Sequence, residues 1–130
     1  MAGRAPENGS AVVLVVDDDE PVRRYMARGL ANAGYRVLLA ADGQEAWALL
    51  ETVGVDAVVT DVSMPCMDGL RLAAGVAKRW PTIAVLLVSG QNRPAECRGP
   101  FLPKPFAVAE LVSAVSGLLE KRQEKSTEKV

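Results

Sequence analysis

The fold is decided by one stretch, Val12-Val13-Leu14-Val15-Val16-Asp17-Asp18-Asp19-Glu20, in which five apolar residues run directly into four acids. A continuous apolar run from Ala11 to Val16 is typical of a strand that is buried on both faces of a parallel sheet. The composition agrees, since 49% of the 130 residues are hydrophobic and only 5% are aromatic. A strand end needs only one polar residue to reach solvent, so four consecutive carboxylates indicate a further role for this edge.

Strand and helix patterns alternate along the rest of the chain. Apolar runs predict strands at residues 11–16, 35–40, 55–60, 83–88 and 101–103. Amphipathic segments between them predict helices that begin at Pro21, Asp42 and Asp68, and a last helix over residues 107–121. Alternating strands and helices of these lengths imply one α/β domain, with a parallel sheet covered by helices on both faces.

Polar side chains follow the predicted strands at one edge of this sheet. Asp17 and Asp18 follow the first strand, Asp61 the third, Ser89 the fourth and Lys104 the fifth. In open parallel sheets the ligand lies beyond the carboxyl ends of the strands, where the strand order reverses. We therefore expect these side chains to meet in one crevice.

Three carboxylates in one crevice repel one another. Two unit charges about 4 Å apart interact by roughly 4 kcal/mol at an effective dielectric constant near 20. A divalent cation relieves this repulsion, and an all-oxygen site suits Mg²⁺, with Lys104 as a further positive charge. Asp61, at the end of the central strand, could then attack a phosphoryl group, since that transfer needs mainly positioning and charge neutralisation. Asp19 and Glu20 are assigned instead to the positive N-terminus of the next helix.

The composition excludes several other classes of protein. The net charge of −1 and the pI near 5.5 give no basic surface for nucleic acid or for an anionic membrane. The sequence has no histidine, which excludes a histidine base or a histidine metal site. Cys66 and Cys97 form no disulfide or metal pattern, and the first apolar run is too short for a signal peptide or a membrane span. A cytoplasmic protein is expected.

Four short motifs occur in order over roughly residues 11–120: Val-Val-Asp-Asp at 15–18, Asp-Val-Ser-Met-Pro-Cys-Met-Asp-Gly at 61–69, Ser-Gly at 89–90 and Lys-Pro-Phe at 104–106. Together they resemble the response-regulator receiver domains of two-component signalling. The resemblance implies a flavodoxin-like (βα)5 three-layer sandwich with a parallel five-stranded sheet in the order 2-1-3-4-5.

The resemblance also implies a phosphoacceptor and a metal site. Asp61 would take a phosphoryl group from a histidine kinase or a histidine phosphotransfer protein. Asp18 and Asp61 would coordinate Mg²⁺ through their side chains, Ser63 through its backbone carbonyl, and Asp17 through a water.

Three further residues take switching roles from the same resemblance. Ser89 would be the switch hydroxyl, and Lys104 the cation that pairs with the phosphate. Phe101 would be the aromatic residue that swings inward on activation. The Lys104–Pro105 bond is expected to be cis, which proline permits at low cost.

The segment between the fourth and fifth strands departs from the family pattern. Residues 89–99 must make a parallel crossover, which normally takes a dozen or more residues and a helix, and Pro94 interrupts them. We predict a fourth helix that is shortened or replaced by a loop, and a monomer or weak dimer because the family's dimer face includes that helix.

The predicted organisation is a flexible N-terminus at 1–10, a receiver domain at 11–120 and a charged tail at 121–130. No output domain follows, so the expected function is a single-domain response regulator, or a phosphate relay or sink, acting on an unknown downstream protein. One alternative is a pseudo-receiver, a protein-interaction module that is never phosphorylated. Another is a Mg²⁺-dependent phosphatase, which would use Asp17 and Asp19 but has Pro21 where a threonine is expected.

Each site residue also has a simpler structural alternative. Asp17 and Asp18 could be helix caps, and Asp61 a solvated loop acid. Ser89 could simply end a strand, and Lys104 could be a structural ion-pair partner. Phe101 could be an immobile aromatic residue of the core. Their placement together at the strand ends favours the functional interpretation.

Overall fold

The computed structural model describes residues 11–62, 68–90, 97 and 99–129, with the side chains of the last helix described as far as Arg122. Five strands form one parallel sheet in the order β2-β1-β3-β4-β5. They are β1 (Val12–Val16), β2 (Arg36–Ala40), β3 (Ala57–Asp61), β4 (Ala84–Ser89) and β5 (Phe101–Pro103). The predicted strand order is confirmed, and β3, at the centre, is buried along its whole length.

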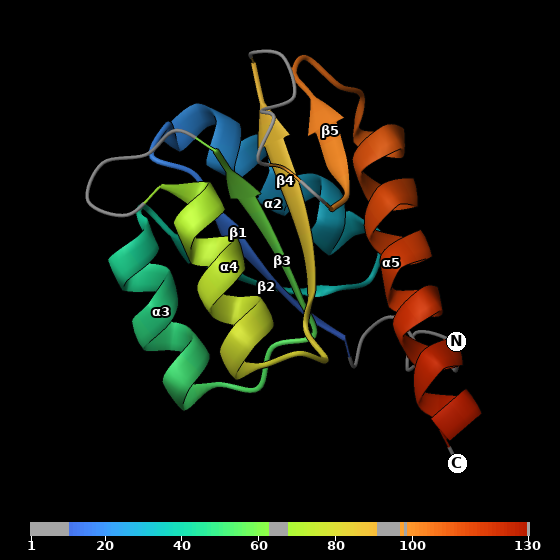
Figure 1. Cartoon of the computed structure of the whole chain (residues 1–130). Coiled ribbons are helices and arrows are strands. Elements are labelled where there is room, and N and C mark those ends of the chain that lie inside the picture. Colours follow the sequence, from blue (N-terminus) through green and yellow to red (C-terminus); the bar gives the residue numbers. More distant parts are fainter. Residues whose placement is uncertain (1–10, 63–67, 91–96, 98, 130) are drawn as a thin grey trace.

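Helices cover both faces of the sheet, which gives the three-layer sandwich (Figure 1). They are α2 (Glu20–Asn32), α3 (Gly43–Thr52), α4 (Gly69–Arg79) and α5 (Val108–Lys129). Helices α2 and α5 pack on one face around Val13, Val15 and Val59, and α3 and α4 pack on the other around Leu14 and Val58. Successive apolar residues of β1 and β3 point to opposite faces and therefore contribute to two cores, one on each face of the sheet.

Helices α3 and α4 begin directly after the expected aspartates, and α2 begins at Glu20, one residue before Pro21. The side chains of Asp19, Asp42 and Asp68 cap the N-termini of α2, α3 and α4. The N–H of Glu45 donates to the side chain of Asp42, and the carboxylate of Glu45 reaches back to accept from the backbone N–H of Ala41, one residue before the position that an ideal capping box uses. Gly34 follows α2 with a φ of 104°, in the left-handed region that glycine adopts without strain. These contacts fix where each helix points as it leaves the sheet edge.

The last helix is longer than predicted. It was expected to end near Lys121, but α5 continues to Lys129. Residues 118–129 contain no glycine or proline and are rich in Leu, Glu, Lys, Arg and Gln, which all favour helix, so the charges alone do not end it. Arg122 also ties this half of α5 to the sheet, since its guanidinium donates to the backbone carbonyl and the carboxylate of Asp56.

Two expectations fall on segments outside the described residues. The described part of the chain holds no helix between Ser89 and Phe101, but residues 91–96 and 98 are not described, so the conformation of the crossover stays a prediction. The same holds for the N-terminal residues 1–10.

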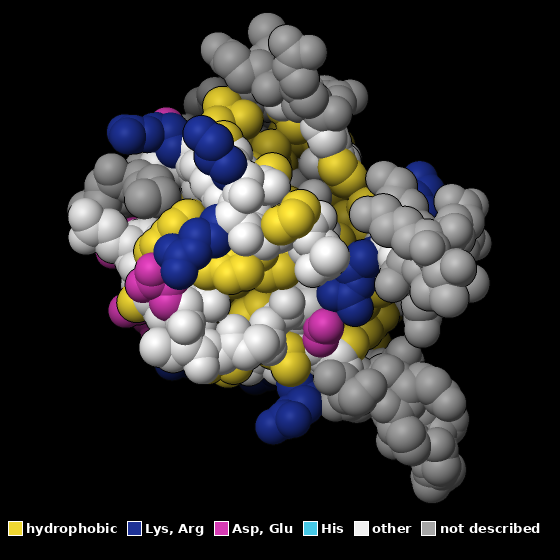
Figure 2. Space-filling view, turned by 60° about the horizontal axis from the view of Figure 1, so that its bottom comes forward, with side chains coloured by type: hydrophobic (Ala, Val, Ile, Leu, Met, Phe, Trp, Pro, Cys, Tyr) yellow, Lys and Arg dark blue, Asp and Glu magenta, His cyan; other side chains and the backbone are white. Residues whose placement is uncertain are grey.

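The face of the molecule shown in Figure 2 carries both signs of charge. Several Lys and Arg side chains and a smaller number of Asp and Glu side chains lie among exposed hydrophobic groups on this face. In the part of the chain that is described, no helix combines the length and the apolar character needed to cross a bilayer.

Candidate functional site

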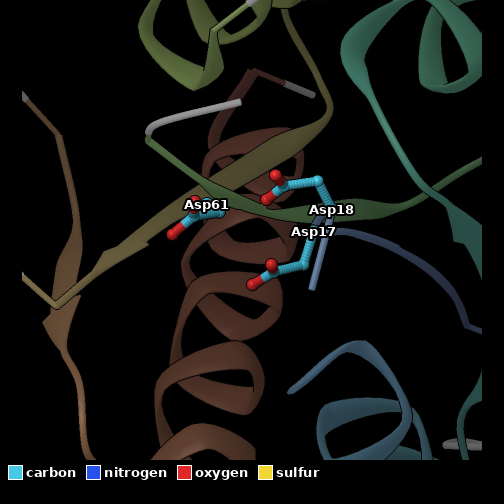
Figure 3. A group of neighbouring side chains, drawn as sticks. All are labelled: Asp17, Asp18 and Asp61. Atoms are coloured by element: carbon cyan, nitrogen blue, oxygen red, sulfur yellow. The ribbon is translucent and has the colours of Figure 1, made fainter. Parts of the chain in front are cut away.

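The carboxyl ends of two adjacent strands, β1 and β3, bring the predicted acids together. Asp61 is the last residue of β3, and Asp17 follows β1, where its N–H continues the ladder by donating to Ala40 of β2. One carboxylate oxygen from each of Asp17, Asp18 and Asp61 lies within 4.8 Å of the other two, and all three groups point into one shared space (Figure 3). The convergence predicted from the strand ends is therefore present.

Lys104 joins this cluster from the end of β5. Its Nζ lies 3.0 Å from Oδ2 of Asp17 and 3.0 Å from Oδ1 of Asp61. Asp17 is only 1% exposed, so its charge is compensated inside the protein, whereas the Lys104 side chain is 22% exposed. An ammonium group held between two buried carboxylates forms charge-assisted hydrogen bonds with both and fixes their orientation.

The donor set of this cluster fits a hard divalent cation. Three carboxylates and one ammonium leave an excess of two negative charges, and all candidate ligands are oxygens. The side chain of Asp18 is exposed, and no other described residue makes a hydrogen bond or ion pair with it. Asp18 and Asp61 are therefore the acids best placed to hold Mg²⁺ directly, whereas both oxygens of Asp17 are already engaged by Lys104 and by the N–H of Asp19.

The surroundings shift the pKa values of two side chains in the site, Asp61 and Lys104. Burial raises the pKa of Asp61 above its ordinary value of 3.8, and the charges of Asp17 and Asp18 raise it further. The hydrogen bond and the charge of Lys104 lower this pKa but do not cancel the rise. Burial opposes the charge of Lys104, but its hydrogen bonds to Asp61 and Asp17 outweigh that effect and raise the pKa of this lysine above 10.5. At neutral pH the lysine is charged, and the ionised form of Asp61 is held at a cost.

The raised pKa of Asp61 predicts that the stability of the metal-free protein depends on pH. Because the pKa of Asp61 is higher in the folded than in the unfolded state, the native state keeps this proton to a higher pH. The free energy of unfolding should therefore fall as the pH rises from 3.8 through the folded-state pKa, and Asp61→Asn should remove that fall. Thermal unfolding in EDTA across this pH range checks it, with the exposed Glu120→Gln as the control. Parallel pH curves for wild type and Asp61→Asn would contradict it.

The other predicted site residues are placed less completely. Ser89 ends β4, is buried, and accepts the N–H of Lys104 at its backbone carbonyl, one residue beyond the partner of Asp61 in the sheet. Phe101 is half-buried in β5 opposite Leu87. The Lys104–Pro105 bond is cis, as expected. Ser63, expected to offer its carbonyl to the metal, lies outside the described residues.

Several residues that support the site did not stand out in the sequence. The hydroxyl of Thr60 donates to the carbonyl of Asp61 at 3.0 Å inside the core. Arg23 donates from Nη1 to the carbonyl of Asp17 at 2.7 Å. Gly69, at the start of α4, donates its N–H to the carbonyl of Val62 at 2.7 Å. Only Gly69 left a recognisable signal, a glycine directly after a capping aspartate.

Comparison with known sequences gives a consistent set of relatives. Residues 13–116 match the family described as the response regulator receiver domain. The chain is 43% identical over 124 residues to sensor kinase CckA of Brucella abortus (strain 2308), covering 88% of this chain and 13% of that protein. It is 37% identical over 116 residues to response regulator MprA of Mycolicibacterium vanbaalenii, covering 84% of this chain and 50% of that one. The chain thus spans half or less of these relatives.

Solved structures agree with the sequence relatives. Chemotaxis response regulator CheY4 of Vibrio cholerae superposes with a TM-score of 0.76 at 30% identity, covering 83% of this chain and 98% of that one. Response regulator TrrA of Thermotoga maritima, solved in complex with Mg²⁺-BeF, superposes with a TM-score of 0.78 at 26% identity and the same coverage. With the sheet order and the acidic cluster described above, these matches show that the chain belongs to the response regulator receiver domain family of two-component signalling.

Proposed function

We propose that this chain is a phosphoacceptor, which takes a phosphoryl group on Asp61 from a histidine kinase or a histidine phosphotransfer protein. The observation that carries the proposal is the position of Asp61 at the end of the central strand, only 8% exposed, bonded to Lys104 and facing Asp17 and Asp18. A carboxylate in this position is oriented and shielded from most of the solvent, as a nucleophile toward phosphorus requires.

The residues of the chain divide the work of transfer. Lys104 orients the carboxylate of Asp61 through Oδ1, which keeps a second lone pair that could face Mg²⁺. Oδ2 is then left to attack the phosphorus in line with the leaving group. The new bond forms between Oδ2 and phosphorus while the bond from phosphorus to the donor's nitrogen breaks. Asp18 and Asp61, with the Ser63 carbonyl and a water on Asp17, would hold Mg²⁺, which supplies positive charge to the phosphoryl oxygens. Ser89 and Lys104 would then hold the transferred group.

The response to phosphate is a change in partner binding. Contacts of the phosphoryl group with Ser89 and Lys104 would favour the state in which the end of β4 closes on Asp61, and Phe101 would move inward with it. A phosphorylated surface then binds a downstream protein that the unphosphorylated chain binds weakly. We place this exchange in the cytoplasm and expect a monomer or weak dimer.

The relatives support a receiver in either of two settings. Sensor kinase CckA is a longer protein in which this chain matches 13% of the length, and MprA is a response regulator of which it matches half. The TrrA structure holds Mg²⁺ and BeF, which agrees with a magnesium-dependent acceptor site here. Both a stand-alone regulator and a relay domain are compatible with transfer to Asp61.

Incubation with an acyl phosphate, such as acetyl phosphate, tests the proposal directly. In the presence of Mg²⁺ the intact mass should increase by one phosphoryl group as acetate leaves, and EDTA should prevent the increase because the acids then repel the incoming phosphate. A receiver known to accept phosphate serves as the control. If the control is modified and this chain is not, the pseudo-receiver alternative replaces the proposal.

A further inference from the structure

Every polar atom of Asp17 has a partner within the fold. Its N–H donates to Ala40 at 3.2 Å, Oδ1 accepts from the N–H of Asp19 at 2.9 Å, and Oδ2 accepts from Lys104 at 3.0 Å. Its backbone carbonyl accepts from Nη1 of Arg23 at 2.7 Å. The first three partners come from the strands and the loop that the site is built on. The fourth partner, Arg23, is a side chain from the first turn of α2, and among these four partners it alone is a side chain carried by a helix.

The carbonyl held by Arg23 controls the direction of the next residue. The C=O of Asp17 and the N–H of Asp18 belong to one rigid peptide plane. Asp18 is exposed, and its carboxylate receives no hydrogen bond or ion pair from the rest of the described chain. The orientation of the Asp18 side chain therefore depends on the backbone that carries it, and Arg23 fixes that backbone.

We infer that Arg23 is a positioning residue for the metal site, which aims the carboxylate of Asp18 by clamping the Asp17–Asp18 peptide plane. The inference rests on the magnesium site proposed above. Outer residues that orient metal ligands typically change metal affinity by 10–100-fold when they are removed. Arg23→Ala should therefore weaken Mg²⁺ binding by about tenfold.

The direction of the change in Mg²⁺ affinity distinguishes a positioning role of Arg23 from an effect of its charge alone. If Arg23 acted only through its positive charge, removing it would tighten the binding of a cation, because a repulsion would be lost. A positioning role predicts weaker binding for Arg23→Ala and recovery of much of the affinity in Arg23→Lys, whose ammonium can still donate to the carbonyl. Arg23→Gln removes the charge but keeps a donor, so it provides a second test should Arg23→Ala fail to fold.

The experiment is a calorimetric titration of metal-free protein with magnesium chloride. Arg24→Ala is the matched control, because it makes the same change in charge one residue away, where the Arg24 side chain is 73% exposed and forms an ion pair with Glu20 at the surface. Arg24→Ala should bind Mg²⁺ as wild type does. The unfolding temperatures of the Arg23 variants in EDTA should lie within a few degrees of that of wild type. If wild type binds and Arg23→Ala binds equally or more tightly, the inference is overturned while the proposed function stands. If wild type binds no Mg²⁺, both fall.

Discussion

Asp61→Asn is expected to abolish phosphoryl incorporation from an acyl phosphate while leaving the fold intact. The amide has the volume of the carboxylate but no anionic oxygen to attack phosphorus. Lys104 keeps its ion pair with Asp17 in the variant, so the end of β5 stays attached to the sheet. Intact mass after incubation with Mg²⁺ and acetyl phosphate measures the loss.

The same chemical change at another strand end provides the control. Asp42 follows β2 and caps α3, and asparagine caps helices as well as aspartate does. Asp42→Asn should therefore be phosphorylated like wild type. Incorporation into Asp61→Asn at the wild-type level would place the acceptor elsewhere.

Gly69→Ala is expected to have the largest effect on stability. A Cβ built at Gly69 would lie 2.0 Å from the backbone oxygen of Asp61 and 3.0 Å from Cα of Val62. Both neighbours are main-chain atoms, so the clash can be removed only if the start of α4 moves away from the end of β3. That movement breaks the hydrogen bond from the N–H of Gly69 to the carbonyl of Val62. We expect a loss of about 3 kcal/mol in the free energy of unfolding, together with slower phosphorylation because the acceptor strand end is displaced.

Substitution of a second glycine by alanine should change the stability in the opposite direction. Gly117 lies inside α5, and a Cβ there would meet nothing within 4 Å. Gly117→Ala should stabilise the protein by about 0.5–1 kcal/mol, since alanine favours helix over glycine. Urea unfolding of both variants checks the pair. Equal stabilities for Gly69→Ala and wild type would show that α4 can move at little cost.

The sheet and the acids of the site were predictable from sequence because both follow from simple periodic rules. Five apolar runs gave five strands, and the parallel arrangement placed Asp17, Asp61 and Ser89 at one edge. The capping side chains of Asp42 and Asp68 were equally readable, because a cap is a local interaction over three residues.

The contacts that refine the site were not predictable, because they depend on distances in three dimensions. Lys104 could pair with one acid or several, and only the fold shows that its Nζ lies between Asp17 and Asp61. Arg23 looks like any helix-surface arginine until its guanidinium is seen on a carbonyl at the strand end. The mixed charges after Glu120 predict a tail, but α5 continues through them because these residue types favour helix.

Chemical mapping of the phosphorylated residue tests the central claim most directly. Borohydride reduces an aspartyl phosphate to homoserine, and peptide mass spectrometry locates the converted residue. The account predicts conversion at Asp61 alone, only after incubation with Mg²⁺ and the phosphodonor. Conversion at Asp17 or Asp18, or phosphate retained on a serine with no conversion at Asp61, would contradict it.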